Sequence, residues 1–382
     1  MNKVSIAGIG QVPVAENWDK SLKELAGEAA LMAMEDANIG YPEGIFIGNM
    51  MSGTANKQLQ LGSLLADWLG NHHKESMGIE AACGSGAAAF RTALMAVASG
   101  ELASVLVVGV EKMTDSPSSE ITASLATAAD ADLEVDFGIS FVALNALIMR
   151  RYMYEYGWKT SDFAAFSINA HANAVHNPFA RFQKAISLKD FERAGMICDP
   201  INLMDASPIG DGAAAIMITS NPFHSNHLPV SVAASSSATD TISLQHRQNA
   251  LQLTAAETSA KRAFQQAGIT PGDIGVFEYH DAFSIMAALS LEACGFCERG
   301  QAPRLANEGK IKFDSEIPVA TMGGLKARGH PVGATGIYQL VEVTQQLRVE
   351  SGVTQVKLPL YGMTQNIGGS GSNVTTHILM QG

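Results

Sequence analysis

One cysteine of this sequence stands where a backbone turn follows a short apolar run. Cys83 lies in GIEAACGSGAAAF, residues 78–90, directly before a stretch of small residues typical of a helix start. Backbone N–H groups at a helix N-terminus stabilise a thiolate, so we expect a lowered pKa and a nucleophilic Cys83. A buried cysteine that packs as a small apolar side chain is the alternative interpretation.

Two histidines occupy comparable positions much later in the chain. His330 lies in GGLKARGHPVGATG, residues 323–336, where five glycines and a proline surround it, and imidazole is a natural base for a thiol. His280 follows an apolar strand in FEYHDAF, and strand C-termini in α/β folds face the ligand crevice. Either histidine could instead be a turn or capping residue hydrogen-bonded to the backbone.

The elements that must position these residues occur twice. Residues 21–50 read as an amphipathic helix followed by a strand, and residues 253–283 repeat that order. Residues 76–113 read as strand, tight turn, helix and strand, and residues 317–369 repeat it. This duplication predicts an α/β fold of two similar halves that pack around a pseudo-two-fold axis. The turns that carry Cys83 and His330 would then meet near that axis.

The first half contains an additional segment. About 90 residues separate VVGVEKM from GAAAIMITS, whereas the second half spans the matching gap in a few residues. We therefore expect an inserted, mostly helical loop domain at about 114–205. The predicted boundaries are 1–225 for the first half, including the insertion, and 226–382 for the second, with a hinge at about 220–240.

Composition excludes several classes of protein. The formal net charge of −12 and the lack of a basic stripe argue against a nucleic-acid partner. No apolar run is long enough to span a bilayer and the N-terminus lacks signal-peptide features, so we expect a cytoplasmic protein without a membrane partner. The four cysteines are too sparse for a disulfide framework. Cys294 and Cys297 form a lone CxxC, which favours helix packing over a metal site.

Together these motifs resemble the thiolase superfamily. The resemblance rests on AACGSGAAAF, VVGVEKMT, HDAF, GGLKARGHPVGATG and NIGGSG in this order, and it covers essentially the whole chain. It is closest to the branch of sterol-carrier-protein-type and archaeal-type acetyl-CoA acetyltransferases. The resemblance implies a five-layered αβαβα fold of two duplicated halves, and acyl transfer to and from coenzyme A without a tightly bound cofactor or metal.

The resemblance also implies roles for individual residues. Cys83 would carry the acyl group as a thioester, and His330 would deprotonate it. His280 would bind a thioester oxygen and stabilise an enolate. The backbone N–H groups of Cys83 and of Gly368 would form the second oxyanion hole. Lys326, Arg328 and Arg181, together with Lys184, are the candidate contacts for the anionic coenzyme A.

The sequence departs from the family at the second catalytic cysteine. Ordinary thiolases carry it in a C-terminal CxG, where this chain has Asn366, and the related branch often has HDCF, where this chain has Ala282. Acylation of Cys83 needs no second thiol, whereas condensation or cleavage needs a base for the α-proton. That base would have to be His330 or His280.

The sequence leaves three functional hypotheses open. The first is an acyl-CoA-dependent C-acyltransferase that works as a homodimer or homotetramer, with a possible zinc-ribbon/OB-fold partner protein. The second is a C-acyltransferase that uses a non-CoA acyl donor within a multi-subunit complex. The third is a non-catalytic scaffold subunit, which the joint presence of Cys83, His280 and His330 disfavours.

Overall fold

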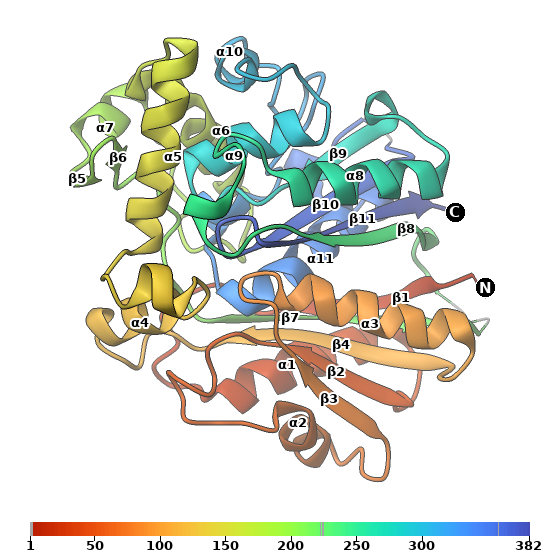
Figure 1. Ribbon diagram of the computed structural model, residues 1–382. Coiled ribbons are helices and arrows are strands. Elements are labelled where there is room, and N and C mark those ends of the chain that lie inside the picture. Colours follow the sequence, from red (N-terminus) through yellow and green to blue (C-terminus); the bar gives the residue numbers. More distant parts are fainter. Residues whose placement is uncertain (1–2, 222, 224, 358) are drawn as a thin grey trace.

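The computed structural model of the chain describes residues 3–221, 223, 225–357 and 359–382. Nine of the strands form one sheet in the order β3-β2-β4-β7-β1-β8-β11-β10-β9, and β5 and β6 form a separate two-stranded sheet (Figure 1). The strands of the first half are β1 (Ser5–Gln11), β2 (Gly44–Gly48), β3 (Glu75–Ile79), β4 (Ser104–Glu111) and β7 (Gly212–Thr219). Those of the second half are β8 (Val230–Thr239), β9 (Ile274–Glu278), β10 (Tyr361–Gly368) and β11 (Asn373–Gln381).

The junction between the two halves is narrow. Strands β1 and β8 pair through Ser5 with Ser231 and Ile6 with Val230, whereas β8 and β11 pair along most of their length. Each half keeps a parallel pair beside antiparallel strands: β2 lies parallel to β3 and β4, and β9 lies parallel to β10. Residues 222 and 224, in the predicted hinge, lie outside the described residues.

Helices cover the sheet in layers. Helices α1 (Leu22–Ala37) and α2 (Leu61–Leu69) pack on the outer face of the first half. Helices α3 (Ser85–Ser99) and α11 (Thr335–Arg348) lie between the halves, and α8 (Thr254–Ala267) and α9 (Ser284–Ala293) cover the outer face of the second (Figure 1). The predicted αβαβα fold of two halves is confirmed.

Strand β4 shows why the layers form. Val105 and Val107 belong to the core around α3 and α11, whereas Leu106, Val108 and Val110 belong to the core around α1 and α2. Successive side chains of a strand point to opposite faces, so a continuous apolar run is buried on both sides.

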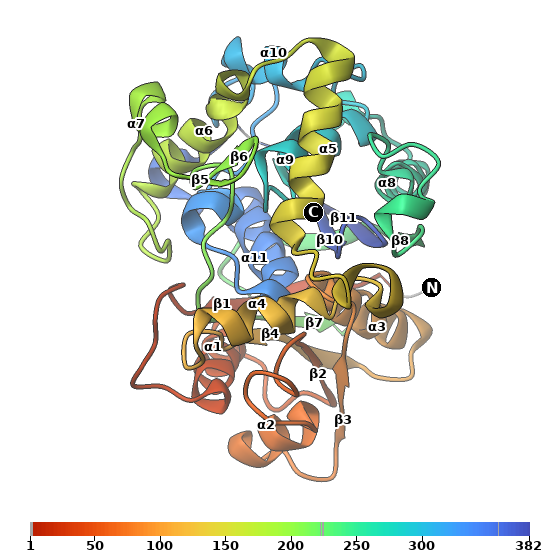
Figure 2. The same ribbon diagram turned by 60° about the vertical axis from the view of Figure 1, so that its left-hand side comes forward.

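Residues 114–205, predicted as an insertion, connect β4 to the segment that precedes β7. They form α4 (Ser118–Ala126), α5 (Phe141–Tyr156), α6 (Ala164–Ala174), α7 (Leu188–Arg193), β5 (Met196–Cys198) and β6 (Ile201–Asn202). Helix α5 stands beside α9, and the short helix α10 (Ala302–Asn307) packs near α6 (Figure 2). Within the described part of the chain, no helix is long and apolar enough to cross a membrane.

The two central helices approach each other closely at their first turns. A Cβ atom on Gly86 of α3 would lie 2.8 Å from the carbonyl oxygen of Gly333 and 3.1 Å from the amide nitrogen of Ile337. These neighbours are backbone atoms that cannot rotate away. Glycine at this position therefore allows the turns of the two halves to meet.

We predict that Gly86→Ala lowers the free energy of unfolding by about 1–3 kcal/mol, because overpacking outweighs the better helix propensity of alanine. Gly40→Ala is the control, since a Cβ there meets nothing within 4 Å. It should change stability by less than about 0.5 kcal/mol in the same urea titration. Equal stability of both variants would contradict the close approach.

Candidate active site

The turn that carries Cys83 is held by a small hydrogen-bond network. Ala82 has a positive φ of 51°, which bends the chain sharply after β3. The Gly84 N–H donates to the Ala81 carbonyl at 2.9 Å, and the Ser85 hydroxyl donates to the Ala82 carbonyl at 2.6 Å. Helix α3 begins directly afterwards, so Cys83 sits at its N-terminal end.

The matching turn of the second half carries His330. It passes through a short π-helical segment, Gly324–Arg328, and the φ angles of Gly323 and Gly329 are 107° and 109°. Only glycine adopts such angles without strain. Asp281, next to His280, accepts a hydrogen bond from the Leu325 N–H at 2.7 Å. The segment after β9 is thereby tied to the His330 turn.

Cys83, His280 and His330 line one pocket of about 240 Å³. Most of its remaining wall is apolar and includes Leu125, Phe141, Pro208, Ala282, Phe283, Met286 and Val332. A larger cavity of about 760 Å³ shares the wall residues Val142, Ala206, Ser207, Pro208 and Ile209 with this pocket. The larger cavity therefore adjoins the pocket that contains Cys83.

The imidazole rings of His280 and His330 lie edge to face, with centroids 5.1 Å apart and planes at 85°. Burial, together with the charge of Arg328, lowers the pKa of His280 to about 3. Burial also lowers the pKa of His330 well below its ordinary value, with further contributions from His280 and Arg328. Both rings are therefore neutral at physiological pH.

The pKa of Cys83 moves in the direction opposite to the sequence-based expectation. Burial and the nearby carboxylate of Glu111 raise the pKa of the Cys83 thiol to about 12, although the N–H groups of Cys83 and Gly369 act against this. The expectation of a lowered pKa is wrong because removal of the sulfur from bulk water outweighs the favourable helix N-terminus. Cys83 is a neutral thiol that needs a base.

Glu111 is a polar residue of the site that the sequence patterns did not single out. It is fully buried, and four N–H donors reach its carboxylate: the Asn49 amide, the backbone N–H groups of Met50 and Met51, and that of Gly333, at 2.8–3.0 Å. Burial nevertheless raises the pKa of Glu111 to about 7. A charged residue at the end of the apolar run SVLVVGVE was the available signal.

Two adjacent glycines follow one another at the end of β10. Gly368, the predicted oxyanion-hole residue, packs so tightly that a Cβ there would lie 2.4 Å from the Ala81 carbonyl oxygen. The neighbouring Gly369 lines the pocket, and its backbone N–H acts to lower the pKa of the Cys83 thiol. Gly369 is therefore a further candidate donor beside Gly368.

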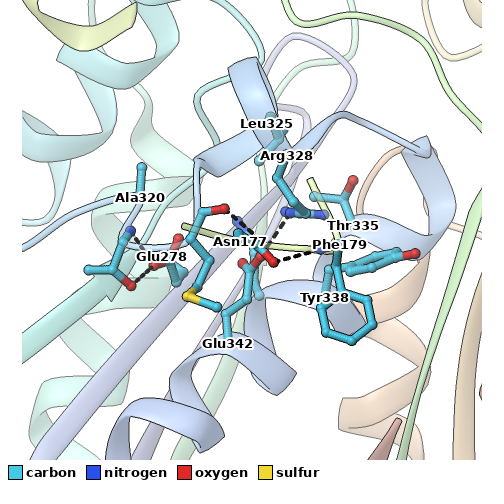
Figure 3. Close-up of polar contacts among 12 residues, drawn as sticks. Asn177, Phe179, Glu278, Ala320, Leu325, Arg328, Thr335, Tyr338 and Glu342 are labelled. Atoms are coloured by element: carbon cyan, nitrogen blue, oxygen red, sulfur yellow. Dashed lines mark hydrogen bonds and ion pairs between the residues drawn. The ribbon is translucent and has the colours of Figure 1, made fainter. Parts of the chain in front are cut away.

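Arg328 does not face a cavity. Its guanidinium is fully buried, forms an ion pair with Glu342 at 2.9 Å and stacks on the Tyr338 ring at 4.7 Å (Figure 3). Such a pair stabilises only while both partners remain, because a lone charge in the interior is costly. The prediction that Arg328 contacts coenzyme A is therefore wrong for this structure.

The other candidate cations lie in different surroundings. Lys326 lines the larger cavity, donates to the Asp205 carbonyl at 2.5 Å, and has its pKa lowered to about 8 by burial. Lys184 lines the same cavity, whereas Arg181 is paired with Glu16 at 2.6 Å. Lys326 and Lys184 thus remain candidate contacts for an anionic ligand, and Arg181 is already engaged.

The residues at the family's second cysteine positions have different surroundings. Ala282 lines the pocket, while Asn366 is fully buried and its amide nitrogen lies 3.1 Å from Nδ1 of His280. Gln365 bonds instead to the Ala256 carbonyl and the Thr376 hydroxyl. Cys294 packs in the core around α8 and α9, and among the described residues no cluster of three or more metal-ligating groups occurs.

Comparison with known proteins gives the same assignment for nearly the entire chain. Residues 8–222 match the thiolase N-terminal domain, and residues 236–381 match the thiolase C-terminal domain-like family. The chain belongs to the thiolase family. The prediction of a thiolase-type acyltransferase is thereby confirmed.

Among thiolase-family relatives, an acetyl-CoA acetyltransferase of Methanothermobacter thermautotrophicus is 42% identical and covers 99% of both chains. Sterol carrier protein 2 of Bos taurus is 30% identical over 98% of this chain and 72% of that protein. The solved structure of an Ltp2-ChsH2(DUF35) aldolase superposes with a TM-score of 0.87 at 23% identity, over 99% of this chain and 98% of the other. At that identity it shows the shared fold alone.

We predict that alkylation of Cys83 by iodoacetamide accelerates with pH without levelling off up to pH 9, because only the thiolate reacts and its pKa lies near 12. Glu111→Gln should shift this profile toward lower pH by roughly one unit, since it removes a repelling charge. Peptide mass spectrometry measures the rate at Cys83 alone.

Glu134→Gln is the matched control, because Glu134 is also buried but accepts from the Leu244 N–H at 2.8 Å in the inserted segment. It should leave the Cys83 profile unchanged. A plateau of the unsubstituted protein below pH 9, or equal shifts in both variants, would contradict the electrostatic account.

Proposed function

We propose that this protein is an acetyl-CoA C-acetyltransferase or closely related acyl-CoA thiolase, in which Cys83 carries the acyl group as a thioester. The observation that carries the proposal is the shared pocket of Cys83, His280 and His330, which adjoins the larger cavity. Relatives named acetyl-CoA acetyltransferase in two archaea support acetyl-CoA as the substrate.

Acyl transfer begins with a neutral thiol and a neutral imidazole. Because the pKa of Cys83 is about 12 and that of His330 is strongly lowered, a stable thiolate–imidazolium pair is unfavourable. The proton therefore moves from Sγ to His330 as the sulfur attacks the thioester carbonyl. The N–H groups of Cys83 and Gly369 stabilise the oxyanion that forms, and coenzyme A leaves as its thiol after taking the proton back.

The larger cavity provides the space for coenzyme A in this proposal. Lys184 and Lys326 supply positive charge, while Ile197, Leu203 and Phe182 offer apolar surface to the pantetheine arm. In this proposal the two halves, predicted at 1–225 and 226–382, supply the reacting groups. The insertion predicted at 114–205 supplies much of the wall that surrounds the substrate.

Acetylation of Cys83 tests the proposal directly. After incubation with acetyl-CoA, intact-mass spectrometry should show an adduct with the mass of one acetyl group. Cys83→Ala should abolish the adduct, whereas Cys198→Ala, which removes a partly exposed cysteine of β5, should retain it. A non-CoA thioester that labels Cys83 when acetyl-CoA does not would support the second hypothesis, and labelling by no donor would support a scaffold.

We further propose a cytoplasmic homodimer or homotetramer that works with a separate zinc-ribbon/OB-fold protein. Strand β3 is a sheet edge with exposed side chains, including Met77, and such edges pair readily with another chain. The solved Ltp2-ChsH2(DUF35) aldolase, which has the same fold, carries the names of two proteins. That name supports a separate partner protein for this chain.

Light scattering measures the oligomeric state. We expect two or four times the chain mass of 40.2 kDa, and a smaller particle for Met77→Lys, which places a charge on the edge strand. A monomer at micromolar concentration would rule out the oligomer.

A further inference from the structure

The two pocket histidines differ in what holds their Nδ1 atoms. Asn366, fully buried on β10, places its amide nitrogen 3.1 Å from Nδ1 of His280. An amide nitrogen only donates, so Nδ1 of His280 must be the acceptor and its proton must reside on Nε2. A neutral His280 therefore presents an N–H donor from its other nitrogen.

In His330, the Nδ1 atom has the opposite hydrogen-bonding role. Its Nδ1 lies 2.7 Å from the hydroxyl of Thr335, and that hydroxyl lies 3.4 Å from the carbonyl oxygen of Pro331. The carbonyl only accepts, and a Thr335 hydroxyl whose one proton is directed at it accepts from Nδ1–H of His330. This is the arrangement that the proposal below assigns. The Nε2 atom of His330 is left with a free electron pair.

Glycine makes room for the first of these contacts. A Cβ atom on Gly336 of α11 would lie 2.5 Å from the Oδ1 atom of Asn366. That Oδ1 atom is buried and has no hydrogen-bond partner within the described chain. The contact with His280 is therefore the one hydrogen bond of the Asn366 side chain within the described chain. It orients the imidazole ring of His280 and does not hold strands of the sheet together.

We propose that Asn366 and Thr335 are positioning residues that fix the two histidines in opposite tautomers, His280 as hydrogen-bond donor and His330 as base. This inference rests on the proposed acyltransferase function. Asn366 stands where ordinary thiolases carry a second cysteine, so the position supplies tautomer control instead of a thiol.

The assignment gives a balanced route for carbon–carbon bond formation. The α-proton of a second acyl-CoA moves to Nε2 of His330, and the electron pair of the broken C–H bond forms the enolate. The enolate oxygen accepts from Nε2–H of His280. The enolate carbon then attacks the acyl carbonyl on Cys83, the C–S bond breaks, and the departing sulfur takes the proton back from His330.

The tautomers can be measured without any substrate. In protein labelled with ¹⁵N-histidine, NMR should show His280 protonated at Nε2 and His330 protonated at Nδ1, with the signals assigned through His280→Gln and His330→Gln. Equal tautomers, or the reverse arrangement, overturn the proposal. This measurement does not depend on whether acetyl-CoA is the substrate, so its failure is distinct from failure of the proposed function.

Substitution of the two positioning residues should affect α-proton exchange and acetylation of Cys83 in different ratios. Asn366→Asp is nearly isosteric, but its carboxylate accepts from Nδ1–H and removes the donor from Nε2 of His280. Exchange of the acetyl-CoA α-protons with solvent should fall roughly 100-fold, while acetylation of Cys83 stays within a few-fold. Thr335→Val should slow both acetylation and α-proton exchange, each about tenfold or more, because His330 is the base in both steps and loses its preferred tautomer.

Gln365→Glu is the matched control, because it makes the same amide-to-carboxylate change on the adjacent residue, whose side chain contacts the Ala256 carbonyl and Thr376. It should leave the ratio of exchange to acetylation unchanged even if stability falls. If Asn366→Asp also preserves that ratio, or if exchange in the unsubstituted protein does not require His280, the tautomer proposal is wrong. If Asn366→Asp does not fold, the NMR measurement still decides.

Discussion

The carboxylate of Glu111 accepts hydrogen bonds from both halves of the chain. On one side it binds the loop after β2, through Asn49, Met50 and Met51, and on the other it binds the Gly333 N–H in the His330 turn. The four donors offset the cost of burying the carboxyl group. Because this group lies where α3 and α11 begin, the positions of Cys83 and His330 relative to each other depend on it.

Cys83 and the two histidines of the pocket carry no charge, although charged side chains lie close to them. Arg328, which is paired with Glu342, contributes to the low pKa values of both histidines, and Glu111 raises the pKa of Cys83. Cys83 and the two histidines are therefore neutral at rest. In the proposed reaction, charge develops only when a substrate carbonyl is present to accept it, which limits side reactions of the thiol with electrophiles in solution.

Sequence patterns identified three residues that line one pocket, Cys83, His280 and His330, but not their surroundings. Motif and duplication placed Cys83 and His330 at equivalent turns, since both are properties of local sequence. The burial of Arg328 and the place of Gly369 in the pocket wall depend on tertiary packing, which a single sequence does not specify. The pKa of Cys83 was misjudged for the same reason: a helix N-terminus is visible in the sequence, whereas desolvation is not.

The wall shared by the two cavities consists of Val142 from α5 and of residues 206–209, just before β7. None of these side chains takes part in the hydrogen-bond networks of Glu111 or the histidines. These lining side chains can therefore change without direct loss of a hydrogen bond in those networks. Substitution of these side chains can change the shape of both cavities while the hydrogen bonds around Glu111 and the histidines, built from the duplicated halves, stay intact.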